Sequence, residues 1–224
     1  ESIINFVKFS NLISPSLTLN KHSGSVNIYS GNIIISNAIF SDGDSEDQLN
    51  IVHSNIIMSD VKFINAKSDS FDCDFCTGEI SNINFLKSGG DALDISGSNL
   101  KISNIVVNYA KDKAISVGEN SNVDIFNVKI ENSSTGLAVK DGSKVNIKNI
   151  TLNKIMHDAF MTYVKKPFYT NYTKLNVMEL LHAHQIEGNL CVRQTNTLAK
   201  IENKLCNETN IDINNLYKQG RMKK

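Results

Sequence analysis

An interval of about 22 residues recurs through the middle of the chain and limits the folds that it can adopt. Apolar residues recur at this interval, and so do polar residues that each open a polar, apolar, any, apolar pattern. Two landmarks that share one period indicate a genuine repeat, and a repeat of this length is typical of a solenoid. The apolar series is Leu49, Phe71, Leu93, Ile115, Leu137 and Ala159. The polar series is Asn37, Asp60, Asn82, Asn104, Asn127 and Asn149.

Each copy of the repeat predicts strands and leaves no room for a helix. Two short windows alternate between apolar and polar residues, as in 92–96 and 100–107, and alternation of this kind indicates strands. A leucine-rich repeat would need one strand in each copy and an asparagine where Ser98, Asn120 and Gly142 stand. The sequence therefore predicts an all-β fold, a right-handed parallel β-helix solenoid with about 22 residues in each coil.

The whole chain, 1–224, is expected to form a single β-helix domain. We assign 25–162 to regular coils, 1–24 to an N-terminal cap or irregular coil, and 163–224 to degenerate coils and a C-terminal cap. Because the chain begins at Glu1 in a strand-like pattern without an initiating Met, we expect it to be part of a longer protein.

Charge and hydropathy exclude two classes of partner. The formal net charge is zero, which gives no general attraction to nucleic acid. No stretch approaches the roughly 18 apolar residues of a membrane span. Asparagine is abundant, and the polar series predicts an asparagine ladder that turns inward at one corner of the coils. The alternative is an exposed row of amides that binds sugar or ice.

Aspartates follow the same period but only in the earlier coils, so stacking would place them in two columns on one face of the solenoid. Neighbours in a column would then lie about 5 Å apart. The first column holds Asp47, Asp69 and Asp91; the second holds Asn50, Asp72 and Asp94, with Asp74 two residues beyond Asp72. Lys113 and Lys140 border these columns.

Carboxylates at such a separation repel each other, which leaves three interpretations. A cation between them would make a calcium site, the one cofactor that the sequence suggests. A shared proton would instead make an acid and a base or nucleophile for glycoside cleavage, with a lysine to hold an acidic sugar. The third interpretation is structural, because Asp also caps turns and solvates exposed sheet faces.

Cysteines and histidines add less. Cys73 and Cys76 have C-x-x-C spacing without a second such pair, and we expect buried, inert thiols. Cys191 and Cys206 could pair. His182 and His184 share one face of an expected strand, a spacing that can bind zinc, although the sequence places no third ligand beside them.

The repeat resembles right-handed parallel β-helix domains of the pectin-lyase-like superfamily, in particular those of large bacterial secreted or surface proteins. The resemblance runs through 47–51, 68–75, 90–98, 113–119 and 136–141. A more distant similarity matches Asp69, Asp91 and Lys140 to aspartate and lysine positions of the polygalacturonase motifs, which would make them catalytic. Where those enzymes carry a further carboxylate, a histidine and an arginine, this chain has Gly90, Lys113 and Ala138.

Members of this superfamily mostly act on or bind polysaccharides, so the resemblance implies an extracellular or cell-surface domain whose partner is a polysaccharide or cell-surface glycan. Asp69, Asp91 and Lys140 would be catalytic, and Asp47, Asp72, Asp74, Asp94 and Lys113 would bind ligand or calcium. The alternative function is a structural or adhesive spacer without catalytic activity, stabilised by calcium. Sparse aromatic residues favour the spacer, whereas the concentration of acids in the early coils favours a site.

Overall fold

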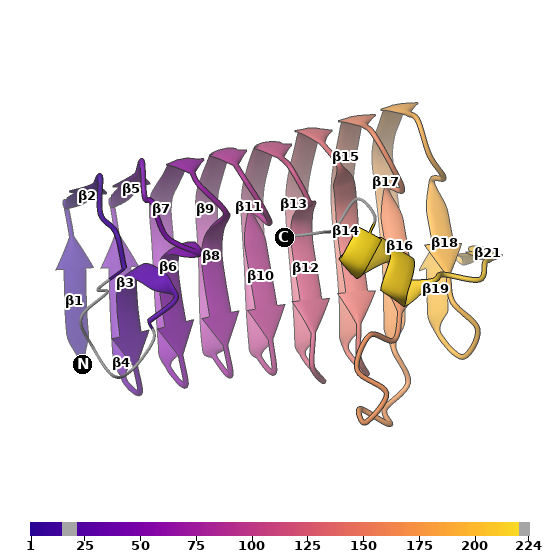
Figure 1. Ribbon diagram of the computed structural model, residues 1–224, viewed down its shortest axis with the longest axis horizontal. Coiled ribbons are helices and arrows are strands. Elements are labelled where there is room, and N and C mark those ends of the chain that lie inside the picture. Colours follow the sequence, from indigo (N-terminus) through magenta and orange to yellow (C-terminus); the bar gives the residue numbers. More distant parts are fainter. Residues whose placement is uncertain (15–21, 220–224) are drawn as a thin grey trace.

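The computed structural model describes residues 1–14 and 22–219 and is a parallel β-solenoid (Figure 1). Each regular coil contributes one short strand and one long strand, and like strands stack along the axis. The predicted all-β fold and parallel coils are confirmed. Among the described residues, no helix is long and apolar enough to span a membrane.

Short strands stack into one sheet, here called the short-strand sheet. In spatial order it contains β21 (Asn207–Glu208), β18 (Cys191–Arg193), β16 (Phe160–Tyr163), β14 (Thr135–Lys140), β12 (Lys113–Gly118), β10 (Leu93–Ser96), β8 (Asp69–Asp74), β6 (Asp47–Val52) and β3 (Gly24–Tyr29). All its pairings are parallel.

Long strands form the second sheet, here called the long-strand sheet. Its path is β1 (Ser2–Asn5), β4 (Asn32–Ser36), β7 (Asn55–Ala66), β9 (Thr77–Ser88), β11 (Asn99–Ala110), β13 (Asn122–Ser133), β15 (Lys144–Ile155), β17 (Lys174–Ile186), β19 (Leu198–Ile201) and β20 (Lys204–Leu205). β2 (Lys8–Ser10) pairs with β5 (Ile39–Ser41), which pairs with β7. One short π-helix, η1 (Asn215–Gln219), follows the last strand.

Register follows the repeat, with one correction. Phe71, Leu93, Ile115 and Leu137 are direct partners in neighbouring strands, as the constant interval predicts. The extension to Ala159 is wrong by one position, because Phe160 is the residue that pairs with Leu137. The coil that follows β14 is one residue longer, and an apolar residue on either side of the position hides this from the sequence.

The predicted asparagine ladder forms, but it faces outward. Every member of the polar series has a positive φ, between 49° and 61°, at the bend within or beside a long strand. Its amides bond from coil to coil, as in Asn104 Nδ2 to Asn82 Oδ1 at 3.0 Å and Asn127 Nδ2 to Asn104 Oδ1 at 3.1 Å. These side chains are exposed or half-buried. The inward orientation was therefore wrong: a left-handed residue at a convex corner points its side chain away from the core, and asparagine tolerates that conformation best after glycine.

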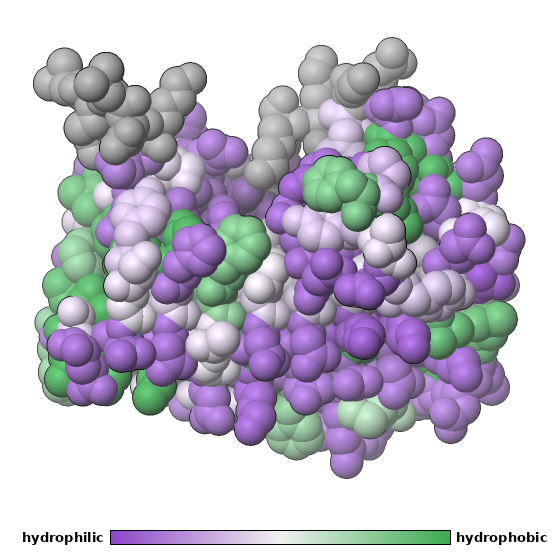
Figure 2. Space-filling model, turned by 90° about the horizontal axis from the view of Figure 1, so that it is seen from below, coloured by the Kyte–Doolittle hydropathy of each residue, from purple (hydrophilic) through white to green (hydrophobic). Residues whose placement is uncertain are grey.

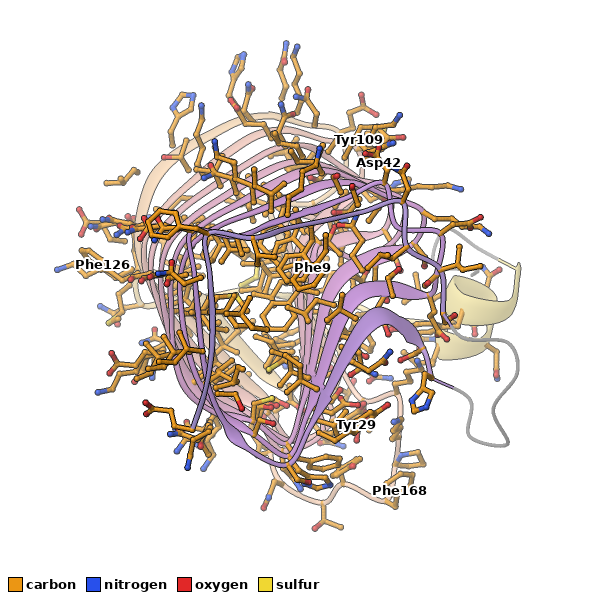
Figure 3. The ribbon with its side chains drawn as sticks, turned by 90° about the vertical axis from the view of Figure 1, so that its left-hand side faces the viewer. Phe9, Tyr29, Asp42, Tyr109, Phe126 and Phe168 are labelled. Atoms are coloured by element: carbon orange, nitrogen blue, oxygen red, sulfur yellow. A yellow bond between two sulfur atoms is a disulfide. The ribbon has the colours of Figure 1, made fainter. Side chains whose placement is uncertain are left out.

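Apolar columns fill the interior between the sheets. Phe9, Phe40, Phe63 and Phe85 stack along the axis with ring centroids 5.0–5.1 Å apart. Figure 3 looks along this axis and shows Phe9 inside the coil and Phe126 projecting from its outside. The face seen in Figure 2 is mostly hydrophilic, with separate apolar patches. The chain thus specifies its fold through the inner columns and leaves the outer columns available for other chemistry.

The four cysteines behave as expected. Cys73 and Cys76 are buried free thiols within the core, which confirms that they are buried as predicted. Cys191 and Cys206 form a disulfide that ties β18 to the segment after β20.

Candidate functional site

The predicted aspartates lie together along the short-strand sheet, in a region that we call the acidic face (Asp47, Asp69, Asp72, Asp74, Asp91 and Asp94). The members of the first column are buried, whereas Asp72, Asp74 and Asp94 are partly exposed. Parallel register carries the first column from Asp47 to Asp69 and the second from Asn50 through Asp72 to Asp94. Each of Asp69, Asp91 and Asp94 has a carboxylate oxygen within 4.8 Å of those of the other two. The stacking predicted from the 22-residue interval is therefore confirmed.

The first column connects successive coils. Asp69 Oδ1 accepts a hydrogen bond from the backbone N–H of Asp91 at 2.9 Å, and Asp91 Oδ1 accepts one from the N–H of Lys113 at 2.9 Å. Asp69 and Asp91 are only 2% and 1% exposed. Charge-assisted hydrogen bonds of this kind stabilise the junction between strands. These two carboxylates therefore have a structural role in addition to any role in binding or catalysis.

Lys113 neutralises part of the buried charge. Its Nζ lies 3.0 Å from Asp91 Oδ1 and also pairs with Asp112, and the side chain is almost fully buried. Burial alone would lower the pKa of Lys113, but the carboxylates of Asp91 and Asp112 overcome it and raise that pKa. The ammonium is therefore fixed in place as a counter-ion.

Lys140 does the same for the second column. Its Nζ donates a hydrogen bond to Ser116 Oγ at 2.6 Å and lies 3.7 Å from Asp94 Oδ1. Burial opposes the charge, and Asp94 raises the pKa of Lys140. Sequence reasoning placed this lysine correctly beside the aspartates but did not identify Ser116 as its partner.

Asp72 and Asp74 lie at the half-buried centre of the acidic face. Burial, together with the nearby charges of Asp94 and Asp74, raises the pKa of Asp72 to about 9. Burial and the charge of Asp94 raise the pKa of Asp74 to about 6. Burial and the neighbouring carboxylates therefore favour the protonated form of Asp72 at neutral pH, while Asp94 lies 3.7 Å from the Lys140 ammonium. A protonated and an ionised carboxyl on neighbouring strands can act as proton donor and acceptor.

Two glycines make room for this arrangement. A Cβ on Gly90 would lie 2.1 Å from Asp69 Oδ1, and one on Gly118 would lie 2.8 Å from Lys140 Cε. Gly90 stands where the polygalacturonase pattern has a carboxylate. In this chain the absent side chain is what allows the Asp69 carboxylate to reach the backbone of the next coil.

One charged residue of the cluster was missed. Burial and the charge of Asp91 raise the pKa of Asp112 to about 6, and its carboxylate pairs with Lys113. Asp112 lies outside the two periodic columns, so the interval could not identify it; its only signal was adjacency to Lys113.

The C-terminal segment (residues 207–219) also reaches the site, which the sequence gave no sign of. Figure 1 shows η1 in front of β14 and β16. Tyr217 places its ring 4.0 Å from Lys165 Nζ and 5.9 Å from Lys113 Nζ, and its hydroxyl lies 2.5 Å from that of Tyr163. Leu216 packs with Met161 in a small apolar cluster. The lysine end of the acidic face is therefore covered, whereas Asp72, Asp74 and Asp94 remain half-exposed.

Comparisons of this chain with protein-family models, with curated proteins and with solved structures each found no match.

Proposed function

We propose that this chain is a polysaccharide-binding domain of an extracellular or cell-surface protein, and that the half-exposed part of its acidic face contacts the sugar. The observation that carries the proposal is the Asp72–Asp94 pair. These residues are direct partners in β8 and β10; the pKa of Asp72 is raised to about 9, and Asp94 lies 3.7 Å from the Lys140 ammonium. Such a pair can donate and accept hydrogen bonds at the same time, which suits sugar hydroxyls.

The charge of the acidic face limits the class of sugar that it is suited to bind. Carboxyls outnumber lysines on this surface, and both lysines are already engaged: Lys113 with Asp91 and Asp112, and Lys140 with Ser116 and Asp94. The face is better suited to a neutral or amino-sugar polymer than to a uronate, because a polyanion would meet uncompensated carboxylates. We therefore favour a neutral or amino-sugar ligand over the acidic sugar that the sequence suggested a lysine would hold.

The same pair could modify its ligand. Neighbouring strands in a sheet lie about 4.8 Å apart, and retaining glycosidases place their two carboxyls roughly 5–5.5 Å apart. In this version Asp72 is the general acid and Asp94 the nucleophile. Asp69 and Asp91, whose catalytic role was suggested by the resemblance to polygalacturonases, would support the site by fixing the coils beneath it.

Binding to a panel of neutral, amino-sugar and uronate polysaccharides tests this proposal, together with an assay for new reducing ends. Wild type should bind a neutral or amino-sugar polymer, and Asp72→Asn with Asp94→Asn should weaken binding strongly. Asp124→Asn, an exposed change on the long-strand sheet, is the matched control and should bind as wild type does. If no polymer binds wild type, or if the double variant binds equally well, the proposal is wrong.

A second candidate, a spacer stabilised by calcium, has one observation in its favour. Calcium ligands lie 2.3–2.6 Å from the ion, so oxygens as close as those of Asp69, Asp91 and Asp94 can share one. The two lysine ammonium groups compete for the same carboxylates. Thermal unfolding with and without millimolar calcium separates the candidates: a rise in Tm that Asp94→Asn abolishes supports the spacer, and an unchanged Tm argues against it.

A further inference from the structure

A second cluster of potential ligands lies away from the acidic face, on the outer side of β17. His182 and His184 are both exposed, and their rings stack with centroids 5.8 Å apart. Both follow an irregularity in β17, where Ile150 pairs with Leu180 but Thr151 pairs with His182. The extra residue, Leu181, is a β-bulge, and a bulge re-aims the side chains that follow it.

The bulge brings the histidines onto the outer columns of the long-strand sheet. Leu152 points into the core, so its neighbours Thr151 and Asn153 point outward. His182 pairs with Thr151 and His184 with Asn153. Since paired residues on adjacent strands have their side chains on the same face, the register places Asn153 and His184 on one outer face of the sheet.

Asn153 supplies the independent observation. Its Oδ1 is inaccessible to solvent and has no hydrogen-bond partner. A buried acceptor left in this state costs about 1–3 kcal/mol, so an unpartnered amide oxygen on the residue that pairs with His184 calls for an explanation. A cation held between them would supply one.

The cluster is also accessible. β19 pairs with β17 only over Lys174–Val177, so in the described chain residues 180–186 have β15 on one side and no strand on the other. An ion could approach the histidines from solvent and keep water molecules in its remaining coordination positions.

We propose that His182, His184 and Asn153 form a binding site for a borderline divalent transition-metal ion, with Zn²⁺ as the representative. Imidazole nitrogen suits Zn²⁺, Ni²⁺ and Cu²⁺, whereas Ca²⁺ and Mg²⁺ prefer all-oxygen sites. Two histidines and one amide oxygen leave a coordination position open, as in sites that exchange a ligand. This inference is independent of the proposed polysaccharide function.

Isothermal titration of the metal-stripped protein with ZnCl₂ tests the site. Wild type should bind one ion here, and His182→Gln or His184→Gln should abolish that binding. Asn153→Ala should weaken it by at least about tenfold, the lower end of the loss caused by removing a group that only supports a metal ligand. His53→Gln, which changes a histidine at another corner, should leave it unchanged.

Circular dichroism checks that each variant is folded, which is expected because both histidines are exposed. Zn²⁺ binding that survives in both histidine variants would overturn the site. Unchanged affinity in Asn153→Ala would overturn the assignment of the amide oxygen as a ligand.

Discussion

Replacing Asp72 by asparagine should stabilise the protein at neutral and alkaline pH. The ordinary pKa of this carboxyl is 3.8, and in the folded protein it is raised to about 9 by burial and by the charges of Asp94 and Asp74. The folded state therefore holds the proton more tightly than the unfolded chain does. The contribution of this group to stability is fully present below about pH 3.8, and it is lost progressively as the pH rises through about 9.

The magnitude follows from linkage. At pH 7 the unfolded chain has lost the proton and the folded protein has kept it. This pH lies roughly three units above the ordinary pKa, and each unit changes the free energy of unfolding by about 1.4 kcal/mol. Because water reaches the half-buried carboxyl and screens part of the charge, we expect Asp72→Asn to raise the free energy of unfolding by roughly 2–4 kcal/mol at pH 7. At pH 4 the gain should nearly vanish.

Urea unfolding followed by circular dichroism at pH 4, 7 and 9 measures this. Wild type should lose stability relative to Asp72→Asn as the pH rises. Asp124→Asn, at an exposed position on β13, is the control and should stay within about 0.5 kcal/mol of wild type at each pH. A constant difference between wild type and Asp72→Asn across the three pH values would refute the reasoning.

Three further changes test the rest of the structure. Phe63→Ala should lower the free energy of unfolding by about 3–5 kcal/mol, because it leaves a gap in the stack of rings; a loss below 1 kcal/mol in urea titration would contradict that packing. Tyr217→Ala should remove the ring that lies over the ammonium of the exposed Lys165 and speed acetylation of that amine in a mass-spectrometric footprint, and an unchanged rate would show that the ring does not shield it. Replacing Cys191 and Cys206 together by serine should lower stability by about 3 kcal/mol, as expected for a closed loop of about 15 residues, and an unchanged denaturation midpoint would count against the disulfide.

Much of the fold could be predicted from the sequence because each coil of a solenoid repeats the same strands and the same core positions. The interval between Phe71 and Leu93 fixes the register of β8 on β10, and the same interval recurs along the chain. The direction of the asparagine ladder was not predictable from the interval, because it depends on the sign of φ at each bend. The displacement from Ala159 to Phe160 was also hidden, since both residues are apolar.

The site was predictable only in part. Stacking brings Asp72 and Asp94 together, and the sequence shows that directly. The contacts of the neighbouring Lys113 come from residues without a periodic relation to the columns: Asp112 pairs with it, and Tyr217 approaches it from a segment more than a hundred residues later. Long-range contacts of this kind follow no regular sequence interval, so the repeat could not predict them.

Carbon-13 NMR titration of the aspartate carboxyls tests the central claim most directly, namely that Asp72 holds a proton at neutral pH beside the Asp94 carboxyl. We predict that Asp72 titrates with a pKa of about 9 and that Asp94→Asn lowers this value toward the ordinary range, because it removes the largest like-charge contribution. If Asp72 instead titrates near its ordinary value of 3.8 and does not respond to Asp94→Asn, the acidic face has no proton donor at neutral pH and the account is contradicted.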